Sequence, residues 1–427
     1  MIKEKQYKKR RKAFGKKLKS NSITVLFSSE YKQRSNDTDF PFRQDSHFYY
    51  LNQFIEDNAA LVFIKKNKKT KAYLFLEIKD PAKELWNGKR LGIDKAKKTF
   101  DFNNVHAIDY LKEFLIENIK EKDTLYYDFK NETKRLKSIQ PLFENITCHK
   151  DISPIIGAMR LIKSKKEICI IKQSIKIAKD AHHQAMKNAK DMKFEYELQA
   201  KIEYIFKKNG AYNDAYTSIV AGGNNANTLH YINNDKELKK GNLVLIDAGC
   251  EYKYYASDIT RTFPIKSKFT KPQKDLYNLV LDTQKKIIAM IAPKVLRSEL
   301  QKEAVKLLTY GMCDLKILKG NPKKLIKNEA YKKYYPHGIG HWLGIDVHDM
   351  SPYKDKNNKE IPLNKGMVLT IEPGIYCEKN DKNIPKKYRG IGIRIEDNIL
   401  VTKKGYKNLS KNIIKEVKDI EKLVANN

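Results

Sequence analysis

Apolar residues in the first part of the chain occur in short runs separated by polar segments. The run at 23–27 is β-branched and bounded by polar residues, which predicts a buried strand. Apolar runs at 59–64 and 72–76 flank a lysine-rich tip and predict a hairpin. Another strand is predicted at 124–127, and helical apolar spacing predicts a helix at 111–119. Strands mixed with helices in this way indicate an α/β domain.

The pattern changes near residue 155. Helical spacing predicts long helices at about 160–190, 194–206 and 273–291, and strands such as 243–246 alternate with helices in the rest of the chain. We therefore predict an α/β (α+β) protein of two domains, residues 1–155 and 156–427.

Composition changes this picture little. The 427 residues include 85 Lys+Arg and 51 Asp+Glu, a formal net charge of +34. Such a charge is typical of nucleic-acid binding, but only 11 of these cations are arginines, the residue favoured for phosphate and guanine contacts. The excess of positive charge is spread over residues 1–150 and 151–427 in proportion to their lengths. We interpret the charge as a bias of composition and predict no nucleic-acid partner.

The five cysteines are odd in number and show no CxxC spacing, which favours a reducing cytoplasm over a disulfide scaffold. The basic N-terminus has no apolar core of a signal peptide, and the spacing of Tyr7, Phe14 and Leu18 predicts a surface helix. No run approaches 18 apolar residues, so no membrane partner is expected.

Acidic residues stand beside or inside apolar, strand-like runs in the second half of the chain. Leu-Ile-Asp247-Ala-Gly is followed by Asp258, and Leu-Thr-Ile-Glu372-Pro-Gly is followed by Ile-Arg-Ile-Glu396-Asp. A buried carboxylate costs several kcal/mol unless it is paired or binds a metal. One such acid could be a structural ion pair, but nearby cations are too few to neutralise four.

Two divalent ions would neutralise the four carboxylates. One histidine completes such a set, and we favour His341 in the segment Pro-His337-Gly-Ile-Gly-His341. Four carboxylates and one imidazole favour Mn²⁺, with Co²⁺, Fe²⁺ or Zn²⁺ as alternatives. Two ions about 3.5–4 Å apart hold a bridging hydroxide for hydrolysis.

Taken together, these motifs resemble the pita-bread metallopeptidase family, which includes methionine aminopeptidases, prolidase, creatinase and aminopeptidase P. The chain is most similar to the aminopeptidase P branch. The segment 31–54 resembles that branch's creatinase-like N-terminal domain, and Met159-Arg-Leu-Ile-Lys-Ser resembles its domain junction. The resemblance implies a pita-bread catalytic domain after the junction.

The resemblance also implies roles. Asp247 would bind one ion, Asp258 and Glu396 would bridge both, and His341 and Glu372 would bind the other. Glu372 would also carry a proton to the leaving nitrogen. The further catalytic residues implied are His230, His337, His348 and Arg394.

The implied activity is hydrolysis of the N-terminal Xaa-Pro bond of peptides with proline second, by a metal-bridging hydroxide. Prolidase, which cuts Xaa-Pro dipeptides with the same metal core, is the alternative. A catalytically dead binding module is the alternative from another class. The family implies homodimers or homotetramers with contacts through the N-terminal domain. Trp86, in a segment that we interpret as a turn, either packs in the core or reaches another subunit.

Several side chains keep two interpretations. Arg394 either pairs with a ligand carboxylate or contacts substrate, and Tyr376 either lines the pocket or packs as a core aromatic. Cys250 is expected to pack. We expect surface or core roles for the remaining histidines, which are His47, His106, His149, His182 and His183.

Overall fold

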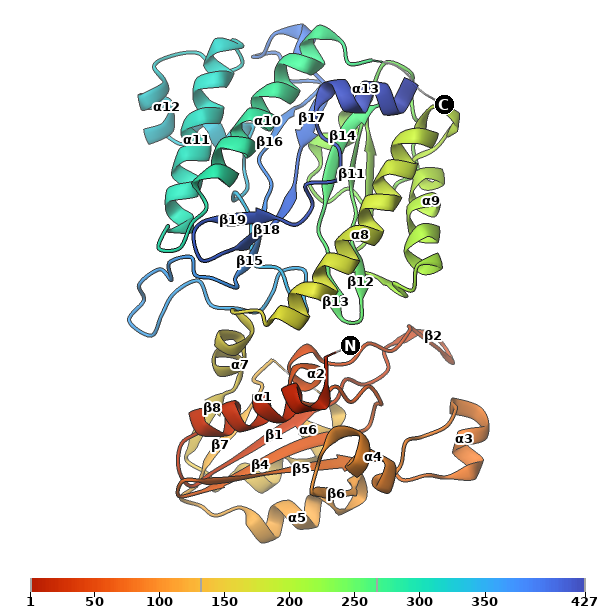
Figure 1. Cartoon of the computed structure of the whole chain (residues 1–427), viewed down its shortest axis with the longest axis vertical. Coiled ribbons are helices and arrows are strands. Elements are labelled where there is room, and N and C mark those ends of the chain that lie inside the picture. The colour runs from red at the N-terminus through yellow and green to blue at the C-terminus, as the bar shows by residue number, and fades with distance from the viewer. Residues whose placement is uncertain (1, 131–132, 266–267, 426–427) are drawn as a thin grey trace. The chain divides into compact units, whose positions relative to one another are not determined.

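The computed structural model describes residues 2–130, 133–265 and 268–425 of the chain (Figure 1). The chain forms two compact units, Met1–Met159 and Arg160–Asn427. The division lies close to the boundary expected at residue 155. The mixed α/β class expected from the sequence is confirmed.

A six-stranded sheet in the order β6-β5-β4-β1-β7-β8 forms the centre of the N-terminal unit. Its strands are β1 (Ser22–Phe27), β4 (Ala60–Lys66), β5 (Lys69–Leu76), β6 (Asn104–Ala107), β7 (Thr124–Tyr127) and β8 (Cys148–Asp151). The predicted hairpin is the antiparallel pair β4–β5, and β1 runs parallel to β7. A short pair, β2 (Gln33–Ser35) and β3 (Thr38–Asp39), lies outside this sheet.

Helices cover both faces of this sheet, with α1 on one face and α5 on the other (Figure 1). The helices between residues 4 and 160 are α1 (Glu4–Lys17), α2 (Ser46–Asn52), α3 (Pro81–Asn87), α4 (Ile93–Phe100), α5 (Leu111–Asn118), α6 (Lys134–Ile139) and α7 (Ser153–Arg160). Every residue of β1 is buried, as expected for a central strand covered on both sides. Its side chains Ile23, Val25 and Phe27 pack in one cluster with Leu111 and Phe114 of α5.

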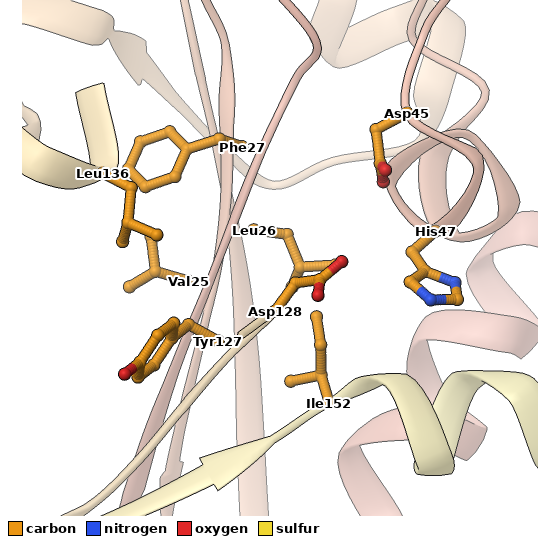
Figure 2. Close-up of a pocket in the computed structure, with 9 residues that line it drawn as sticks. All are labelled: Val25, Leu26, Phe27, Asp45, His47, Tyr127, Asp128, Leu136 and Ile152. Atoms are coloured by element: carbon orange, nitrogen blue, oxygen red, sulfur yellow. The ribbon is translucent and has the colours of Figure 1, made fainter. Parts of the chain in front are cut away.

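A small hollow lies in the N-terminal unit near the ends of β1 and β7 (Figure 2). Its polar lining is Asp45, His47 and Asp128, and its other walls are apolar or aromatic. The Asp45 carboxylate already accepts the Phe48 amide at 2.7 Å as the N-cap of α2. None of the residues that the sequence marks for catalysis or metal binding lines this hollow.

The second unit combines long helices with short strands. Its helices are α8 (Lys165–Asn188), α9 (Glu195–Lys208), α10 (Lys271–Met290), α11 (Arg297–Asp314), α12 (Pro322–Lys327) and α13 (Val417–Ala425). Its strands are β9 (Asn213–Asp214), β10 (Ile219–Gly222), β11 (Leu243–Asp247), β12 (Cys250–Tyr252), β13 (Tyr255–Ala256), β14 (Thr260–Pro264), β15 (Val368–Ile371), β16 (Gly374–Cys377), β17 (Ile391–Arg394), β18 (Asp397–Val401) and β19 (Tyr406–Asn408).

These strands form small antiparallel sheets that carry the acidic motifs. The sheet β10-β11-β14 holds the first aspartate motif, while β15-β18-β19 and β16-β17 hold the two glutamate motifs. Helix α10 packs against the glutamate sheets through Ile287 and Ile288, which share a cluster with Leu369, Ile371 and Ile399. The apolar residues around the acids therefore bury the strands that carry them.

Two local expectations differ from the structure. The helix expected at about 160–190 is α8, which begins at Lys165 rather than near 160, because α7 ends at Arg160 and Ser164 intervenes. Ser164 caps α8 by accepting the Glu167 amide, and Glu167 accepts the Ser164 amide in return, so a new N-terminus forms there. Trp86 lies in helix α3 rather than in a turn, and its side chain is 85% exposed.

Among the described residues, no helix has the length and apolar character needed to cross a membrane.

Candidate active site

Asp247 and Asp258 are brought together by a tight reversal of the chain. Asp247 ends β11, where it pairs with Ile219 of β10 on one side and Thr260 of β14 on the other. A side chain at Gly249 would place its Cβ 1.8 Å from the Ser257 carbonyl oxygen. Only glycine permits this close approach, and the two aspartates consequently face the same site.

His341 and Glu372 are joined through the backbone of β15. The Thr370 amide donates to the His341 carbonyl at 2.9 Å, and the His341 amide donates to the Thr370 hydroxyl at 3.0 Å. Gly340 allows this contact, because a Cβ there would lie 2.0 Å from the Thr370 carbonyl oxygen. The same hydroxyl donates to Glu372 Oε1 at 3.2 Å, so Thr370 holds both candidate ligands.

Glu396 follows β17 and has an incomplete set of partners. Its Oε2 accepts from the Thr260 hydroxyl at 2.9 Å. Its Oε1 is buried and has no hydrogen-bond partner among the described residues. An unsatisfied carboxylate oxygen in a buried site is costly unless something else binds there.

The candidate ligands converge. Atoms of Asp258, His341 and Glu396 all lie within 4.8 Å of one another. His341 Nε2 is 3.2 Å from Asp258 Oδ2 and 3.5 Å from Glu372 Oε1. The other ring nitrogen, Nδ1, is 3.0 Å from the Trp342 carbonyl, which can only accept. This contact assigns the proton to Nδ1 and turns Nε2 toward the carboxylates, as in a metal-binding imidazole.

Tyr216 is a functional residue that the sequence analysis missed. Its hydroxyl is 2.5 Å from Asp247 Oδ1 and 2.6 Å from Asp258 Oδ1. One hydroxyl hydrogen cannot serve both carboxylates, so the second short contact needs another proton or a cation. The sequence gives no signal for this contact, because it depends on the pairing of Ile219 of β10 with Asp247 in the folded sheet.

Burial, together with neighbouring negative charge, raises the pKa values of two of the candidate ligands. Burial raises the pKa of Glu372 to about 7, with His341 opposing the shift and Asp258 adding to it. Burial also raises the pKa of Glu396 well above its ordinary value, and the charges of Asp258, Glu372 and Asp247 act in the same direction. Burial lowers the pKa of His341, but Asp258 more than reverses this and raises it to about 9.

These observations fit a site for divalent cations. The orphaned Glu396 oxygen, the shared Tyr216 hydroxyl and the raised carboxyl pKa values all show negative charge in excess of the cations present. Oxygen donors with one imidazole suit Mn²⁺ and neighbouring divalent ions. Among the described residues, Arg394 contacts the candidate ligands directly, through an ion pair with Asp247.

Arg394 links the cluster to His337. Its Nη2 donates to Asp247 Oδ2 at 2.7 Å and its Nη1 donates to the Tyr376 hydroxyl at 2.9 Å. That hydroxyl is 2.8 Å from His337 Nε2, and His337 Nδ1 is 2.9 Å from the Gly338 carbonyl. The carbonyl assigns the proton to Nδ1, so the tyrosine donates to Nε2. Arg394 thus pairs with a candidate ligand, and Tyr376 joins Arg394 to His337.

A cavity of about 530 Å³ opens onto the cluster. All five candidate metal ligands and Arg394 line it. His230, His337 and His348 line it as well, together with the apolar residues Ile219, Leu229, Ile232 and Val347. The structure therefore brings every candidate site residue from the sequence into one cavity.

The residues expected to be structural lie elsewhere. Cys250 packs against Ser174 and Ser257. His182 is buried behind β11, where its Nε2 lies 3.0 Å from the Ala248 carbonyl. All five cysteines are free thiols.

Behind the cavity, Gln284 of α10 is a second residue that the sequence analysis missed. Its fully buried amide donates to the Ile371 carbonyl at 3.2 Å and to the Ile395 carbonyl at 2.9 Å. Each carbonyl belongs to the residue just before a candidate glutamate ligand. A glutamine in an amphipathic helix gives no sequence signal of which carbonyls it reaches.

Comparison with known proteins identifies the class. Residues 169–403 match the model of metallopeptidase family M24, and residues 7–126 match that of the aminopeptidase P N-terminal domain. The chain belongs to metallopeptidase family M24, and it is a metal-dependent hydrolase of pita-bread fold.

The relatives are similar over almost the whole of this chain. A Xaa-Pro aminopeptidase of Haemophilus influenzae is 42% identical over 98% of this chain and 97% of its own length. Human Xaa-Pro aminopeptidase 3 is 36% identical over 95% of this chain and 81% of its own length. A solved structure of zinc-substituted Escherichia coli aminopeptidase P in complex with product is 35% identical, with a TM-score of 0.94 over 99% of this chain and 98% of that chain.

Proposed function

We propose that the chain is a Xaa-Pro aminopeptidase, which releases the first residue from peptides with proline second. The observation that carries this proposal is the buried cluster of four carboxylates and His341, which lines a cavity together with apolar residues. The relatives described above bear that name and are similar over nearly the whole chain. They do not favour the prolidase alternative.

We infer that two divalent ions bind in this cluster, with Mn²⁺ favoured by its ligands. Asp247, Asp258, His341, Glu372 and Glu396 would hold them. The E. coli relative is described in a zinc-substituted form, so zinc is an alternative. When bound, the ions would supply a Lewis acid and lower the pKa of a water.

The protein's own groups would orient the peptide and move the proton. His230 and His348 line the cavity and would position the scissile carbonyl. His337, whose two ring nitrogens contact the Tyr376 hydroxyl and the Gly338 carbonyl, would position the peptide through the ring that it presents to the cavity. The Glu372 carboxylate would accept a proton from the attacking water and deliver it to the leaving prolyl nitrogen.

Selectivity for proline follows from the chemistry of its peptide bond. A Xaa-Pro amide has no N–H, so peptidases that bind that hydrogen lose a contact. The apolar lining residues Ile219, Leu229, Ile232 and Val347 offer packing surface for a pyrrolidine ring. Apolar contact of this kind gives a proline-second substrate an advantage that needs no hydrogen bond.

We also propose a cytoplasmic enzyme that forms a homodimer or homotetramer. Five free thiols suit a reducing compartment. The N-terminal unit exposes Leu85 and Trp86 on α3, an apolar pair that suits contact with another subunit.

A peptide-length assay with Mn²⁺ tests this function. The purified chain should release arginine from Arg-Pro-Pro and leave Arg-Ala-Pro intact. Faster cleavage of Arg-Pro than of Arg-Pro-Pro would identify a prolidase instead. Failure to cleave either, with Mn²⁺ bound, would support the binding module.

A pair of variants connects that activity to the cluster. Asp258→Asn should lose Mn²⁺, measured as metal per chain, together with activity. Asp381→Asn is the control, because Asp381 is a well-covered acid that pairs with Lys333 away from the cluster. An Asp258→Asn protein with full metal and full activity would contradict the assignment.

A further inference from the structure

A second group of buried charges lies beside the cavity and is not part of the ligand set. Arg160 Nη2 donates to Asp349 Oδ1 at 2.5 Å and to Asp346 Oδ2 at 2.5 Å. Lys163 Nζ donates to Asp349 Oδ2 at 3.0 Å. The side chains of Arg160, Lys163 and Asp349 are at most 2% exposed. Burial alone would raise the pKa of Asp349, but Arg160 and Lys163 hold it well below its ordinary value.

The two aspartates bracket two residues of the cavity. Val347 and His348 stand between Asp346 and Asp349 in the chain, and both line the cavity. The His348 ring stacks on the His341 ring, with centroids 3.8 Å apart and planes 18° apart. One guanidinium therefore binds both ends of the short segment that presents His348.

The Asp349 carboxylate also fills the inside of this segment. A Cβ at Gly344 would lie 2.6 Å from the carboxylate carbon of Asp349. The Asp349 amide donates to the Trp342 carbonyl at 2.9 Å, and the Ser351 hydroxyl donates to Asp349 Oδ2 at 3.1 Å. The segment has no helix or strand from 344 to 350, so these side-chain contacts determine its conformation.

A buried ion cluster is weak evidence for stability, because desolvation of its charges offsets their attraction. A guanidinium has a rigid fork that fixes the geometry of the carboxylates it binds. Orientation of the segment is therefore the property that this cluster is suited to supply.

We propose that Arg160 is a positioning residue that orients His348 in the active-site cavity through Asp346 and Asp349. This inference rests on the proposed peptidase function. Arg160 lies in the Met-Arg-Leu-Ile-Lys-Ser segment, which the catalytic roles above leave without a function.

A double-mutant cycle on the Mn²⁺-loaded enzyme tests the proposal. Arg160→Gln should lower kcat/KM for Arg-Pro-Pro by roughly 10- to 100-fold, the effect typical of residues that orient catalytic groups. In the His348→Ala background the same change should have little further effect, because the group that it orients is gone. Arg160→Lys should restore part of the activity, since it keeps the charge without the fork.

Two controls separate orientation from stability. Arg10→Gln removes another buried arginine, which contacts the Tyr50 carbonyl in the N-terminal unit, and should lower Tm without changing kcat/KM. Metal per chain should stay at the wild-type value in Arg160→Gln. If that variant does not fold, Asp346→Asn gives the same cycle, because its side chain is 26% exposed.

The outcomes are distinct. Equal losses from Arg160→Gln in the wild-type and His348→Ala backgrounds would overturn the proposal, as would loss of bound Mn²⁺ in proportion to activity. Wild-type activity in Arg160→Gln would overturn it as well. A wild-type enzyme that fails to cleave Arg-Pro-Pro would instead contradict the proposed function.

Discussion

His182 shows at the scale of one residue how burial controls protonation in the catalytic unit. Its ring is fully buried in α8, and Nε2 lies 3.0 Å from the Ala248 carbonyl. Burial lowers the pKa of His182 to about 3, and the nearby charge of Arg261 adds to the shift. The folded protein therefore holds His182 neutral over a pH range in which the unfolded chain protonates it.

This difference makes stability depend on pH. In the unfolded chain this histidine, with a pKa of about 6.5, binds a proton that it does not bind in the folded protein. The contribution of His182 to the free energy of unfolding is therefore fully present above about pH 6.5 and is lost as the pH falls toward 3. Between about pH 7.5 and pH 5 the contribution to the free energy of unfolding should fall by about 2 kcal/mol. Urea titrations with a chelator should show this fall in wild type, and a smaller fall in His182→Gln.

His149 provides the control for that measurement. It is an exposed histidine of β8, and His149→Gln should keep the wild-type dependence of stability on pH. Identical pH dependence in His182→Gln and wild type would show that His182 titrates normally in the folded protein.

Helix α10 supports the active site at the scale of an element. It runs behind β15 and β17, and its Gln284 donates to the carbonyls that precede Glu372 and Glu396. The Gln284 oxygen accepts from Lys415 at 2.6 Å, so the amide itself cannot rotate freely. One side chain therefore binds the backbone just before both candidate glutamate ligands.

Replacing this amide should weaken metal binding. Gln284→Met keeps the size of the side chain but removes the amide that donates to two buried carbonyls, which should lower the free energy of unfolding by roughly 1–3 kcal/mol. Because the backbone before both glutamates loses this donor, the Kd for Mn²⁺ measured by calorimetry should rise by roughly tenfold or more.

Gln273→Met is the matched control. Gln273 lies on the same helix and donates to a single carbonyl, that of Gly241, which precedes β11 at the end opposite to Asp247. It should lose stability and keep its Mn²⁺ affinity. Equal Mn²⁺ affinities in the two variants would mean that Gln284 has no special relation to the ligands.

The sequence predicts most of these elements because their apolar patterns are strong. The runs around Asp247 and Glu372 identify buried strands, and an acid that ends such a strand is conspicuous. The break at 161–164 is harder to predict, because apolar residues continue through it and only the Ser164–Glu167 cap marks the new helix.

Support from other parts of the chain cannot be predicted in this way. Tyr216 precedes a short strand and Gln284 lies on a helix face, and neither position suggests a role by its spacing. Tyr216 contacts Asp247, which is 31 residues away along the chain. Gln284 contacts the carbonyls of Ile371 and Ile395, which are 87 and 111 residues away. Such contacts depend on sheet register and helix packing, which exist only in the folded chain.

At the scale of the whole molecule, positive charge is less evenly distributed than the averages over residues 1–150 and over the remainder suggest. The first 19 residues contain ten Lys or Arg and one acid, and the hairpin tip at 65–71 contains five lysines. These segments lie together, because Lys65 Nζ donates to the Leu18 carbonyl at 2.6 Å and Thr70 packs on Gly15. The N-terminal unit therefore carries a concentrated basic surface on α1 and the β4–β5 hairpin.

The surplus charge should attract peptides that end in a free carboxylate. For Glu-Pro-Pro, which carries a net charge of −1, kcat/KM should fall several-fold between about 20 mM and 300 mM NaCl, because salt screens interactions over a Debye length. The amidated peptide Glu-Pro-Pro-NH₂, with no net charge, serves as the control and should show a flatter dependence. Equal salt dependence for both peptides would leave the net charge without a role in catalysis.

The position of Arg160 and Lys163 also decides where the chain can be cut. They stand in the short segment before α8, where a domain boundary invites truncation. A fragment starting at Ser164 would retain every candidate ligand and cavity histidine, yet it would bury the Asp349 carboxylate without a cation, at roughly 3–5 kcal/mol. A minimal catalytic fragment, or a chimera with a foreign N-terminal unit, therefore has to keep the chain from residue 160 onward.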